Sequence, residues 1–339
     1  PAPARGLQAA VVSRVKLMAD LDIAERRAPQ DGRVRVRLEE REMDLRVSAV
    51  PTLYGESLVL RLLDRGGRPV GLEDLGMSPA TLDRFRALAA LPHGLLLATG
   101  PTGSGKTTTL YAALALRHTA AEKVITVEDP VEYHLGGVTQ VPVNRKAGIT
   151  FASALRSILR QDPDVLMVGE MRDAETAALA TQAALTGHLV FSTLHTNDAV
   201  SATTRLLDLK VEPYLIAATL EAVLAQRLVR SICPECREPQ PADPHELATL
   251  APHGARLPTL YRGRGCAACR HTGYRGRAGI FELLTVTDEI RRALVQSEPE
   301  HAVREIARSQ GMSTLAEDGW AKAQAGVTTV EEVLRVTEH

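Results

Sequence analysis

The sequence predicts an α/β protein with a doubly wound, mainly parallel sheet at its core and a smaller α+β domain at the N-terminus. Three observations lead to this fold class. From about Gly94 onward, continuous apolar runs alternate with helical patterns, as in buried parallel strands. A glycine-rich segment, residues 100–107, joins the first apolar run to a helical pattern. Nearer the N-terminus, charged and apolar residues alternate, which is typical of strands with one exposed face.

Residues 1–68 are expected to form the α+β domain. Its first strand has a period of two, with Arg33, Arg35 and Arg37 between apolar neighbours. Further strands are expected at 43–50 and 58–63. A helix-like segment starts almost at residue 7, so we expect the chain to be cut from a longer protein.

A Gly/Pro/Arg-rich linker and a helix are expected within 69–93, ahead of an α/β core at 94–232. The core strands are predicted at 95–99, 124–127, 165–169 and 189–193, and core helices from 105 and at 174–185. Residues 233–280 hold all four cysteines around a Pro-rich insertion, and 281–339 show short amphipathic helical patterns. We therefore expect a cysteine module followed by a helical C-terminal subdomain.

The composition excludes several classes of protein. The 339 residues contain 40 Lys and Arg against 41 Asp and Glu, and aromatic residues make up 3%. A nucleic-acid binder would be more basic, with more aromatic residues for base stacking. No run of 18 apolar residues and no signal-peptide pattern is present, so neither a transmembrane segment nor an export signal is expected. Few, paired cysteines favour a metal site in the cytosol.

A nucleotide phosphate site is predicted at "GPTGSGKT", which matches GxxxxGK[ST] between an apolar strand and a helix pattern. Backbone N–H groups of such a loop and the helix N-terminus bind phosphates. Lys106 should reach the β- and γ-phosphates, and the Thr107 hydroxyl should ligate Mg²⁺. The expected nucleotide contacts are Gly100, Pro101, Thr102, Gly103, Ser104, Gly105, Lys106, Thr107 and Thr108.

Two acids are expected at the carboxyl ends of two strands, on the edge of the sheet where such sheets bind ligands. Glu170 closes the apolar run in "DVLMVGE", and Glu128 closes "ITVE". One would orient or deprotonate the attacking water while the other supports the Mg²⁺ shell, and this division of roles stays open. His195 follows a further strand and is placed to sense the γ-phosphate. His188 precedes that strand, where a structural role is equally plausible.

These four motifs, in this order, resemble the secretion ATPases of type II secretion and type IV pilus assembly, in which they are called Walker A, Asp box, Walker B and His box. The resemblance runs from about residue 7 to the C-terminus. It implies a RecA-like core, a PAS-like N-terminal domain and a homohexamer that hydrolyses ATP. It also implies nucleotide bound between the two domains, with arginines that neutralise the phosphates. The matching arginines are Arg46, Arg61, Arg156 and Arg172.

The cysteines form two CxxC pairs, Cys233 with Cys236 and Cys266 with Cys269, a spacing typical of a structural four-thiolate zinc site. This insertion resembles the tetracysteine module of the type II secretion ATPase and the pilus extension ATPase, which the retraction ATPase lacks. The resemblance therefore implies a motor that assembles a pseudopilus for protein export across the outer membrane. Pilus extension is the alternative, and a nucleic-acid translocase a more distant one.

The same resemblance implies a cytoplasmic protein, peripheral on the inner membrane, that acts on membrane platform proteins. Two departures from the pattern concern subunit contacts. Some relatives carry Arg where this chain has Ser153, and His-Gly-Glu-Arg where it has "YGES". From the resemblance we also expect the family's leading N-terminal domain, which docks on a membrane-bound partner, to be missing from the sequence given.

Overall fold

The computed structural model describes residues 5–38, 41–64, 70–117, 121–244 and 259–338. The chain divides into two compact units, the first made of 1–69 with 131–135 and the second of the remaining residues. In the described residues, no helix is long and apolar enough to cross a membrane.

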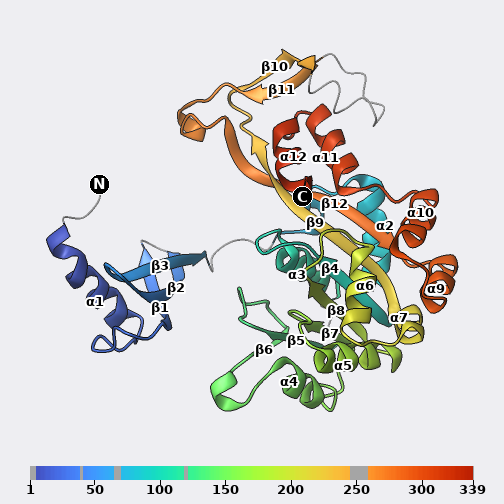
Figure 1. The fold of residues 1–339 in the computed structure, drawn as a ribbon, viewed down its shortest axis with the longest axis horizontal. Coiled ribbons are helices and arrows are strands. Elements are labelled where there is room, and N and C mark those ends of the chain that lie inside the picture. The colour runs from blue at the N-terminus through green and yellow to red at the C-terminus, as the bar shows by residue number, and fades with distance from the viewer. Residues whose placement is uncertain (1–4, 39–40, 65–69, 118–120, 245–258, 339) are drawn as a thin grey trace. The chain divides into compact units, whose positions relative to one another are not determined.

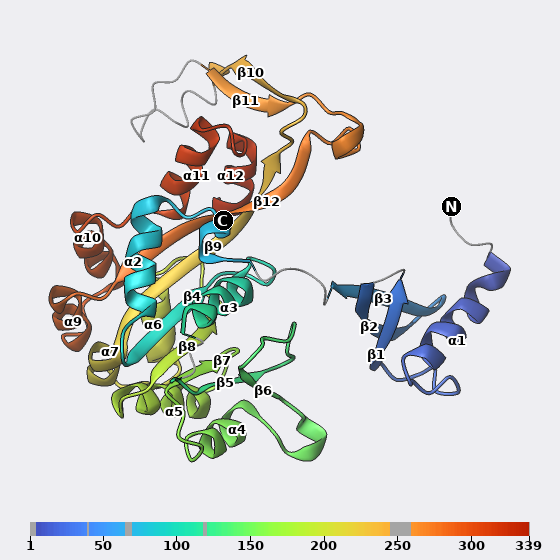
Figure 2. The same cartoon turned by 180° about the vertical axis from the view of Figure 1, so that it is seen from behind.

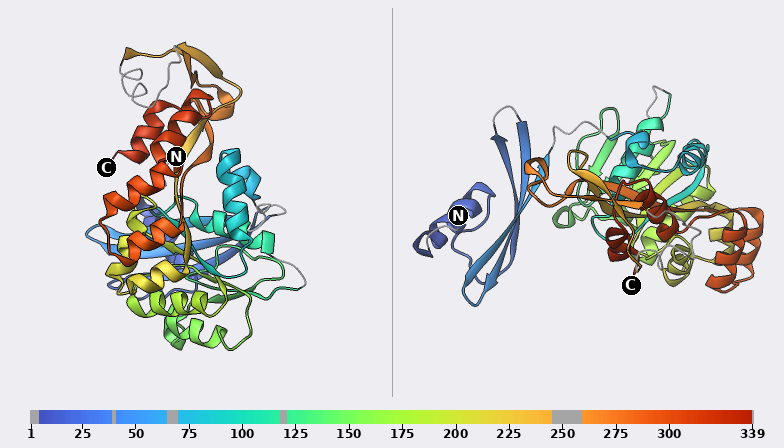
Figure 3. Two further views of the ribbon diagram at one scale, coloured as in Figure 1. Left: turned by 90° about the vertical axis from the view of Figure 1, so that its right-hand side faces the viewer. Right: turned by 90° about the horizontal axis from the view of Figure 1, so that it is seen from above.

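The first unit is a three-stranded antiparallel sheet with one helix against it (Figure 3). Its elements are η1 (Arg5–Leu7), α1 (Gln8–Met18), β1 (Gln30–Leu38), β2 (Arg41–Thr52) and β3 (Gly55–Asp64). Ala19, Val34 and Val47 form its buried core on the side of α1. The alternation in β1 thus gives one apolar face toward α1 and one polar face, as predicted. An α+β domain is confirmed, and the PAS-like assignment stays a prediction.

The second unit is built on a seven-stranded sheet in the order β12-β9-β4-β8-β7-β5-β6 (Figure 1). Its strands are β4 (Gly94–Thr99), β5 (Val124–Glu128), β6 (Thr139–Pro142), β7 (Val165–Val168), β8 (Leu189–Leu194), β9 (Leu220–Ile232) and β12 (Tyr274–Thr285). Neighbours pair in parallel except β12 with β9. A mainly parallel sheet is therefore confirmed.

Helices cover both faces of this sheet. In β4, Leu95 and Leu97 belong to a core cluster with Ala177 and Ala180 of α5 (Ala174–Leu185). Successive strand residues point to opposite faces, and β4 also contacts α3 (Lys106–Arg117). α2 (Pro79–Ala89) packs against α3 (Figure 2) and begins at Ser78, whose side chain caps it. The core is therefore doubly wound, as expected.

Shorter helices complete the second unit. They are η2 (Leu72–Leu75), η3 (Arg145–Ala147), α4 (Phe151–Ile158), α6 (Ser201–Asp208), α7 (Pro213–Thr219), α9 (Asp288–Val295), α10 (Glu300–Ser309), α11 (Leu315–Gln324) and α12 (Val330–Thr337). The last four form the helical C-terminal region that the amphipathic patterns predict.

The sequence analysis did not predict two long strands of the structure, β9 and β12. β9 and β12 pair along most of their length and extend beyond the parallel strands toward the cysteine region (Figure 1). There, β10 (Arg237–Pro241) and β11 (Thr259–Gly263) form a two-stranded ribbon, followed by η5 (Ala267–Cys269). β12 thus links the cysteines directly to the edge of the core sheet.

Candidate functional site

The glycine-rich loop lies where the sequence places it, between the end of β4 at Thr99 and the start of α3 at Lys106. Gly100 and Gly105 have φ angles of +144° and +92°, which side chains rarely adopt. A Cβ at Gly100 would lie 2.4 Å from the Gln226 carbonyl oxygen, and one at Gly105 would lie 2.7 Å from Gln226 Nε2. Both positions therefore require glycine, because β9 passes directly against the loop.

Lys106 is buried at the start of α3, with 8% of its surface exposed. Its ammonium group donates to the carbonyl oxygens of Gly100 at 2.7 Å and Pro101 at 3.1 Å. Burial, and then the positive charge of Arg227, lower its pKa to about 8, against the opposing attraction of Glu170. The ammonium group thus lies inside the loop, where it is repelled by Arg227 and attracted by Glu170.

The loop fits a bound phosphate chain. The buried Oγ atom of Ser104 has no hydrogen-bond partner among the described residues. Pro101, Thr102 and Gly103 are exposed, so the outer part of the loop is open to solvent. An unpartnered buried hydroxyl is costly unless a ligand satisfies it. Gly-rich loops at a helix N-terminus bind anions in this way.

Glu170 lies just past β7 and is brought together with two of the predicted residues. Its Oε2 atom lies 2.6 Å from Arg172 Nε and 3.6 Å from His195 Nε2. The Glu170 side chain is 13% exposed, while Arg172 and His195 are 66% and 45% exposed. This acid, base and cation therefore form one cluster at the carboxyl edge of the sheet.

Glu128 has different surroundings. It is the last residue of β5 and is buried. Its carboxylate accepts hydrogen bonds from the Tyr111 hydroxyl, from Thr126 Oγ1 at 2.5 Å and from Gln140 Nε2 at 3.2 Å. These partners lie on α3, β5 and β6, so the carboxylate connects the helix of the phosphate loop to the edge of the sheet.

Arg156 and His188 lie in other contacts. Arg156, on α4, pairs with Glu175 at the start of α5, and both side chains are exposed. His188 Nδ1 lies 3.0 Å from the Ala183 carbonyl oxygen at the end of α5. This contact agrees with the structural alternative for His188. Among the described residues the partner of Arg156 is Glu175 and not Glu170, so its role at the phosphates stays a prediction.

Arg46 and Arg61 lie in the first unit, directly opposite each other on β2 and β3. Arg33 on β1 is the register partner of Arg46, so three arginines form a row across the sheet. The row lines a cavity of about 470 Å³ on the face away from α1. Arg33 joins the two arginines that the sequence predicts, and Asp31 lines the same cavity. Contact of this row with nucleotide phosphates stays a prediction.

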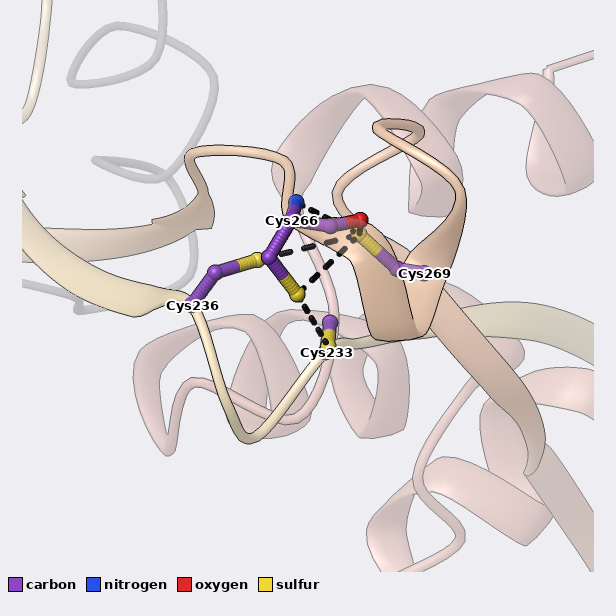
Figure 4. Close-up of side chains that lie close together, drawn as sticks. All are labelled: Cys233, Cys236, Cys266 and Cys269. Carbon is purple, nitrogen blue, oxygen red and sulfur yellow. Dashed lines mark hydrogen bonds between the residues drawn. The ribbon is translucent and has the colours of Figure 1, made fainter.

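The four cysteines converge as the spacing predicts (Figure 4). Their sulfur atoms all lie within 4.8 Å of one another, and three of the pairs are 3.8 to 3.9 Å apart. A zinc ion with four thiolates at about 2.3 Å requires sulfur atoms about 3.8 Å apart. The residues fit a closed, tetrahedral zinc site with no open position.

Backbone N–H groups favour the thiolate form of Cys269. The N–H groups of Cys266 and Gly273 donate to Cys269 Sγ at 3.1 and 3.3 Å. The bond from Cys266 is the main cause that lowers the pKa of the Cys269 thiol to about 6. Such N–H to sulfur bonds orient the ligands of a metal and disperse their charge.

The sequence analysis missed two further residues that lie beside the phosphate loop, Gln226 and Arg227. Gln226 and Arg227 of β9 are 2% and 4% exposed. Gln226 Oε1 accepts a hydrogen bond from Thr109 Oγ1 at 2.7 Å, and Arg227 Nη2 donates to the Asn197 carbonyl oxygen at 2.7 Å. The signal was present as a polar Gln-Arg pair inside the apolar run "LEAVLAQRLV". Buried polar residues in such a run point to a specific partner.

Comparison with known proteins shows similarity to one protein family. The model of the family described as "Type II/IV secretion system protein" matches residues 2–335. Type II secretion system protein E of Pseudomonas aeruginosa is 54% identical over 335 residues, which are 99% of this chain and 66% of that protein. Type II secretion system ATPase E of Vibrio cholerae is 50% identical over 337 residues, with 99% and 67% covered. The chain thus spans about two thirds of the length of these relatives.

Two further similarities concern pilus proteins. Type IV pilus assembly ATPase PilB of Thermus thermophilus is 51% identical over 335 residues, which cover 98% of this chain and 38% of PilB. The solved structure of the pilus retraction motor PilT with bound ADP has a TM-score of 0.68 and 26% identity. That similarity covers 92% of this chain and 78% of the PilT chain.

Proposed function

This chain belongs to the type II/IV secretion system protein family, and on that premise we propose that it is the ATP-hydrolysing motor of a type II secretion system. Its hydrolysis of ATP to ADP and phosphate would drive pseudopilus assembly and so protein export across the outer membrane. The observation that carries the proposal is 50–54% identity to relatives named for type II secretion, over 99% of the chain. The phosphate loop and the Glu170 cluster supply the chemistry.

The nucleotide site needs positioning and charge neutralisation more than covalent catalysis. The backbone N–H groups of the loop other than Pro101, which has none, and Ser104 Oγ would bind the phosphates. Lys106 would exchange its bonds to the loop carbonyl groups for bonds to phosphate oxygens. The Thr107 hydroxyl would hold Mg²⁺. When bound, that ion neutralises charge on the β- and γ-phosphates.

Glu170 is the residue we assign to the attacking water. Its carboxylate lies at the edge of the sheet beside His195 and Arg172, whereas Glu128 is enclosed by Tyr111, Thr126 and Gln140. A general base must reach the water it orients, which favours the more accessible acid. Arg172 would neutralise phosphate charge, and His195 would sense the γ-phosphate from the segment after β8.

The remaining parts of the proposal rest on family membership. We propose a homohexamer, peripheral on the cytoplasmic side of the inner membrane, that acts on membrane platform proteins. The tetracysteine cluster would bind a structural zinc ion, because its sulfur atoms have tetrahedral spacing. Arg46, Arg61 and Arg156 are proposed to neutralise nucleotide phosphates.

Pilus extension is the second candidate, because PilB of Thermus thermophilus is 51% identical. Both candidates are filament-extending ATPases, so hydrolysis by itself does not separate them. Complementation of a type II secretion mutant by the full-length protein does: restored export supports the first candidate, whereas restored pili without export support the second.

Hydrolysis is tested by measuring phosphate release by the whole chain with Mg²⁺ and ATP. The Lys106→Ala variant should lose activity by at least about 100-fold, since the cation would contact the transferred phosphate. Substitution of the exposed Lys146 by Ala serves as a matched control and should leave the rate unchanged. Equal rates in the wild type and the Lys106→Ala variant would overturn the assignment of the phosphate loop.

A further inference from the structure

We propose that Arg227 is a positioning residue of the nucleotide site. Its buried guanidinium group fixes the backbone that carries His195 to the floor of the phosphate loop, so that both segments meet a triphosphate in one arrangement. This inference rests on the proposed ATPase function and adds a residue that none of the four sequence motifs contains.

The first step is that β9 forms the floor of the phosphate loop. β9 runs parallel to β4, with Ala225 opposite Thr99, so Gln226 and Arg227 lie beside the residues that follow Thr99. A Cβ at Gly100 would lie 3.0 Å from Arg227 Nη1 as well as 2.4 Å from the Gln226 carbonyl oxygen. The guanidinium group is therefore in close contact with the first residue of the loop.

The second step is that the same guanidinium group holds the segment after β8. Arg227 Nη1 donates to the Gln226 carbonyl oxygen at 3.2 Å, and Nη2 donates to that of Asn197 at 2.7 Å. A separate bond of 2.7 Å joins the hydroxyl groups of Thr99 and Thr196. The two residues that follow His195 are thus each tied to the phosphate loop or its floor.

The third step concerns the charge. Arg227 is 4% exposed, its Nε atom has no partner, and no ion pair of this side chain is found in the described ranges. Asp198 and Glu282 attract it only at longer range. A buried cation bonded to two carbonyl groups costs more desolvation than an apolar side chain of similar size. Packing alone therefore does not explain an arginine here, whereas a fixed link between the segment after β8 and the strand beneath the phosphate loop does.

The other side of the same segment is also fixed. Asp198 Oδ2 accepts a bond of 2.9 Å from Arg304 of α10, and the Ala199 N–H donates to Glu282 of β12 at 2.8 Å. The residues 196–199 therefore lie between the phosphate loop on one side and the C-terminal region on the other. Arg227 joins this segment to β9 beneath the loop, in addition to the bond between Thr99 and Thr196.

The test uses a double-mutant cycle on the whole chain. Arg227→Lys keeps the charge, but its ammonium group lacks the planar fork that bridges the two carbonyl oxygens. We expect kcat to fall about tenfold and KM for ATP to rise by a similar factor, because the segment that carries His195 no longer meets the γ-phosphate in one arrangement. The double variant Arg227→Lys/His195→Ala should match His195→Ala within about twofold, since both act through the same segment.

A second readout does not need turnover. The affinity of a non-hydrolysable ATP analogue, divided by that of ADP, should fall about tenfold in Arg227→Lys while ADP binding stays within about twofold. Asn197→Ala is the matched control, because it keeps the backbone carbonyl group that accepts the bond from Arg227. Thr196→Val removes the hydroxyl tie and should change kcat and the affinity ratio in the same direction, so the inference remains testable if Arg227→Lys folds poorly.

The outcomes separate the inference from the proposed function. A wild type without turnover whose affinity ratio still depends on Arg227 contradicts the proposed function and supports the inference. An active wild type whose kcat and affinity ratio are both unchanged by Arg227→Lys overturns the inference alone. Effects of Arg227→Lys and His195→Ala that multiply in the double variant also overturn it, since they indicate independent roles.

Discussion

His195 Nε2 lies 3.6 Å from the Oε2 atom of Glu170, although the two residues follow different strands, β8 and β7. Parallel strands deliver their carboxyl ends to one edge, so neighbouring strands bring together residues that are distant in the sequence. Arg172 approaches the same carboxylate oxygen at 2.6 Å. This cluster is where we expect the phosphoryl chemistry to be sensitive to substitution.

The roles of the two acids are separable. We expect Glu170→Gln to lower kcat by at least about 100-fold while ADP still binds, as for loss of a general base. Glu128→Gln should cause the smaller loss of kcat and the larger fall in melting temperature, because it disrupts a buried hydrogen-bond network. Steady-state kinetics and thermal denaturation of both variants check this, and the reverse pattern would assign the water to Glu128.

Metal content tests the cysteine cluster. The wild type should contain about one zinc ion per chain, and the Cys233→Ser/Cys236→Ser variant should contain almost none. Elemental analysis of both proteins, purified without added zinc, measures the zinc content per chain. Arg264→Ala, an exposed change in the same region, is the control and should retain the metal. Equal zinc in the wild type and the double cysteine variant would contradict the site.

Glu332 should give the C-terminal region an acid-sensitive contribution to stability. Burial opposes its ionisation, but hydrogen bonds from Arg335 and Arg230 outweigh this and hold its pKa at about 2. A folded-state pKa below the unfolded value stabilises the fold above about pH 4.5, by about 3 kcal/mol at most, and that contribution is lost as pH falls toward 2.

Glu332→Gln tests this contribution. The variant should be less stable than the wild type at pH 7, and the difference should shrink as the pH is lowered from 5 to about 3. Thermal denaturation followed by circular dichroism across this range measures it. The exposed neighbour in the same helix provides the control, since Glu331→Gln should change stability little at any pH. A difference that is constant with pH contradicts the role of the carboxylate charge.

Assembly should appear in the kinetics. If the proposed homohexamer completes the site, ATPase rate per chain should rise with protein concentration and level off as assembly saturates. Light scattering on the same samples measures the mass at each point. A rate per chain that is flat across a range in which the mass increases would indicate that each subunit works alone.

Much of the fold and part of the site could be predicted from local sequence. The strands β4, β5, β7 and β8 are apolar runs of the length that buried parallel strands need, and the glycine-rich loop has fixed spacing between two such elements. The CxxC pairs also specify their own geometry over a few residues. In each case the physical cause acts within a short stretch of chain, so the residues alone reveal it.

The tertiary structure decided what depends on distant segments. The antiparallel pairing of β9 with β12 brings residues about 50 positions apart into register, and β9 in turn places Arg227 under a loop that begins at Gly100. Glu128 and Glu170 likewise have different surroundings because different strands lie next to them. By itself, the sequence determined the phosphate loop, the strand ends and the cysteine pairs. Burial and contact across the sheet decided which charged groups meet, because electrostatic and hydrogen-bond partners are set by space rather than by order along the chain.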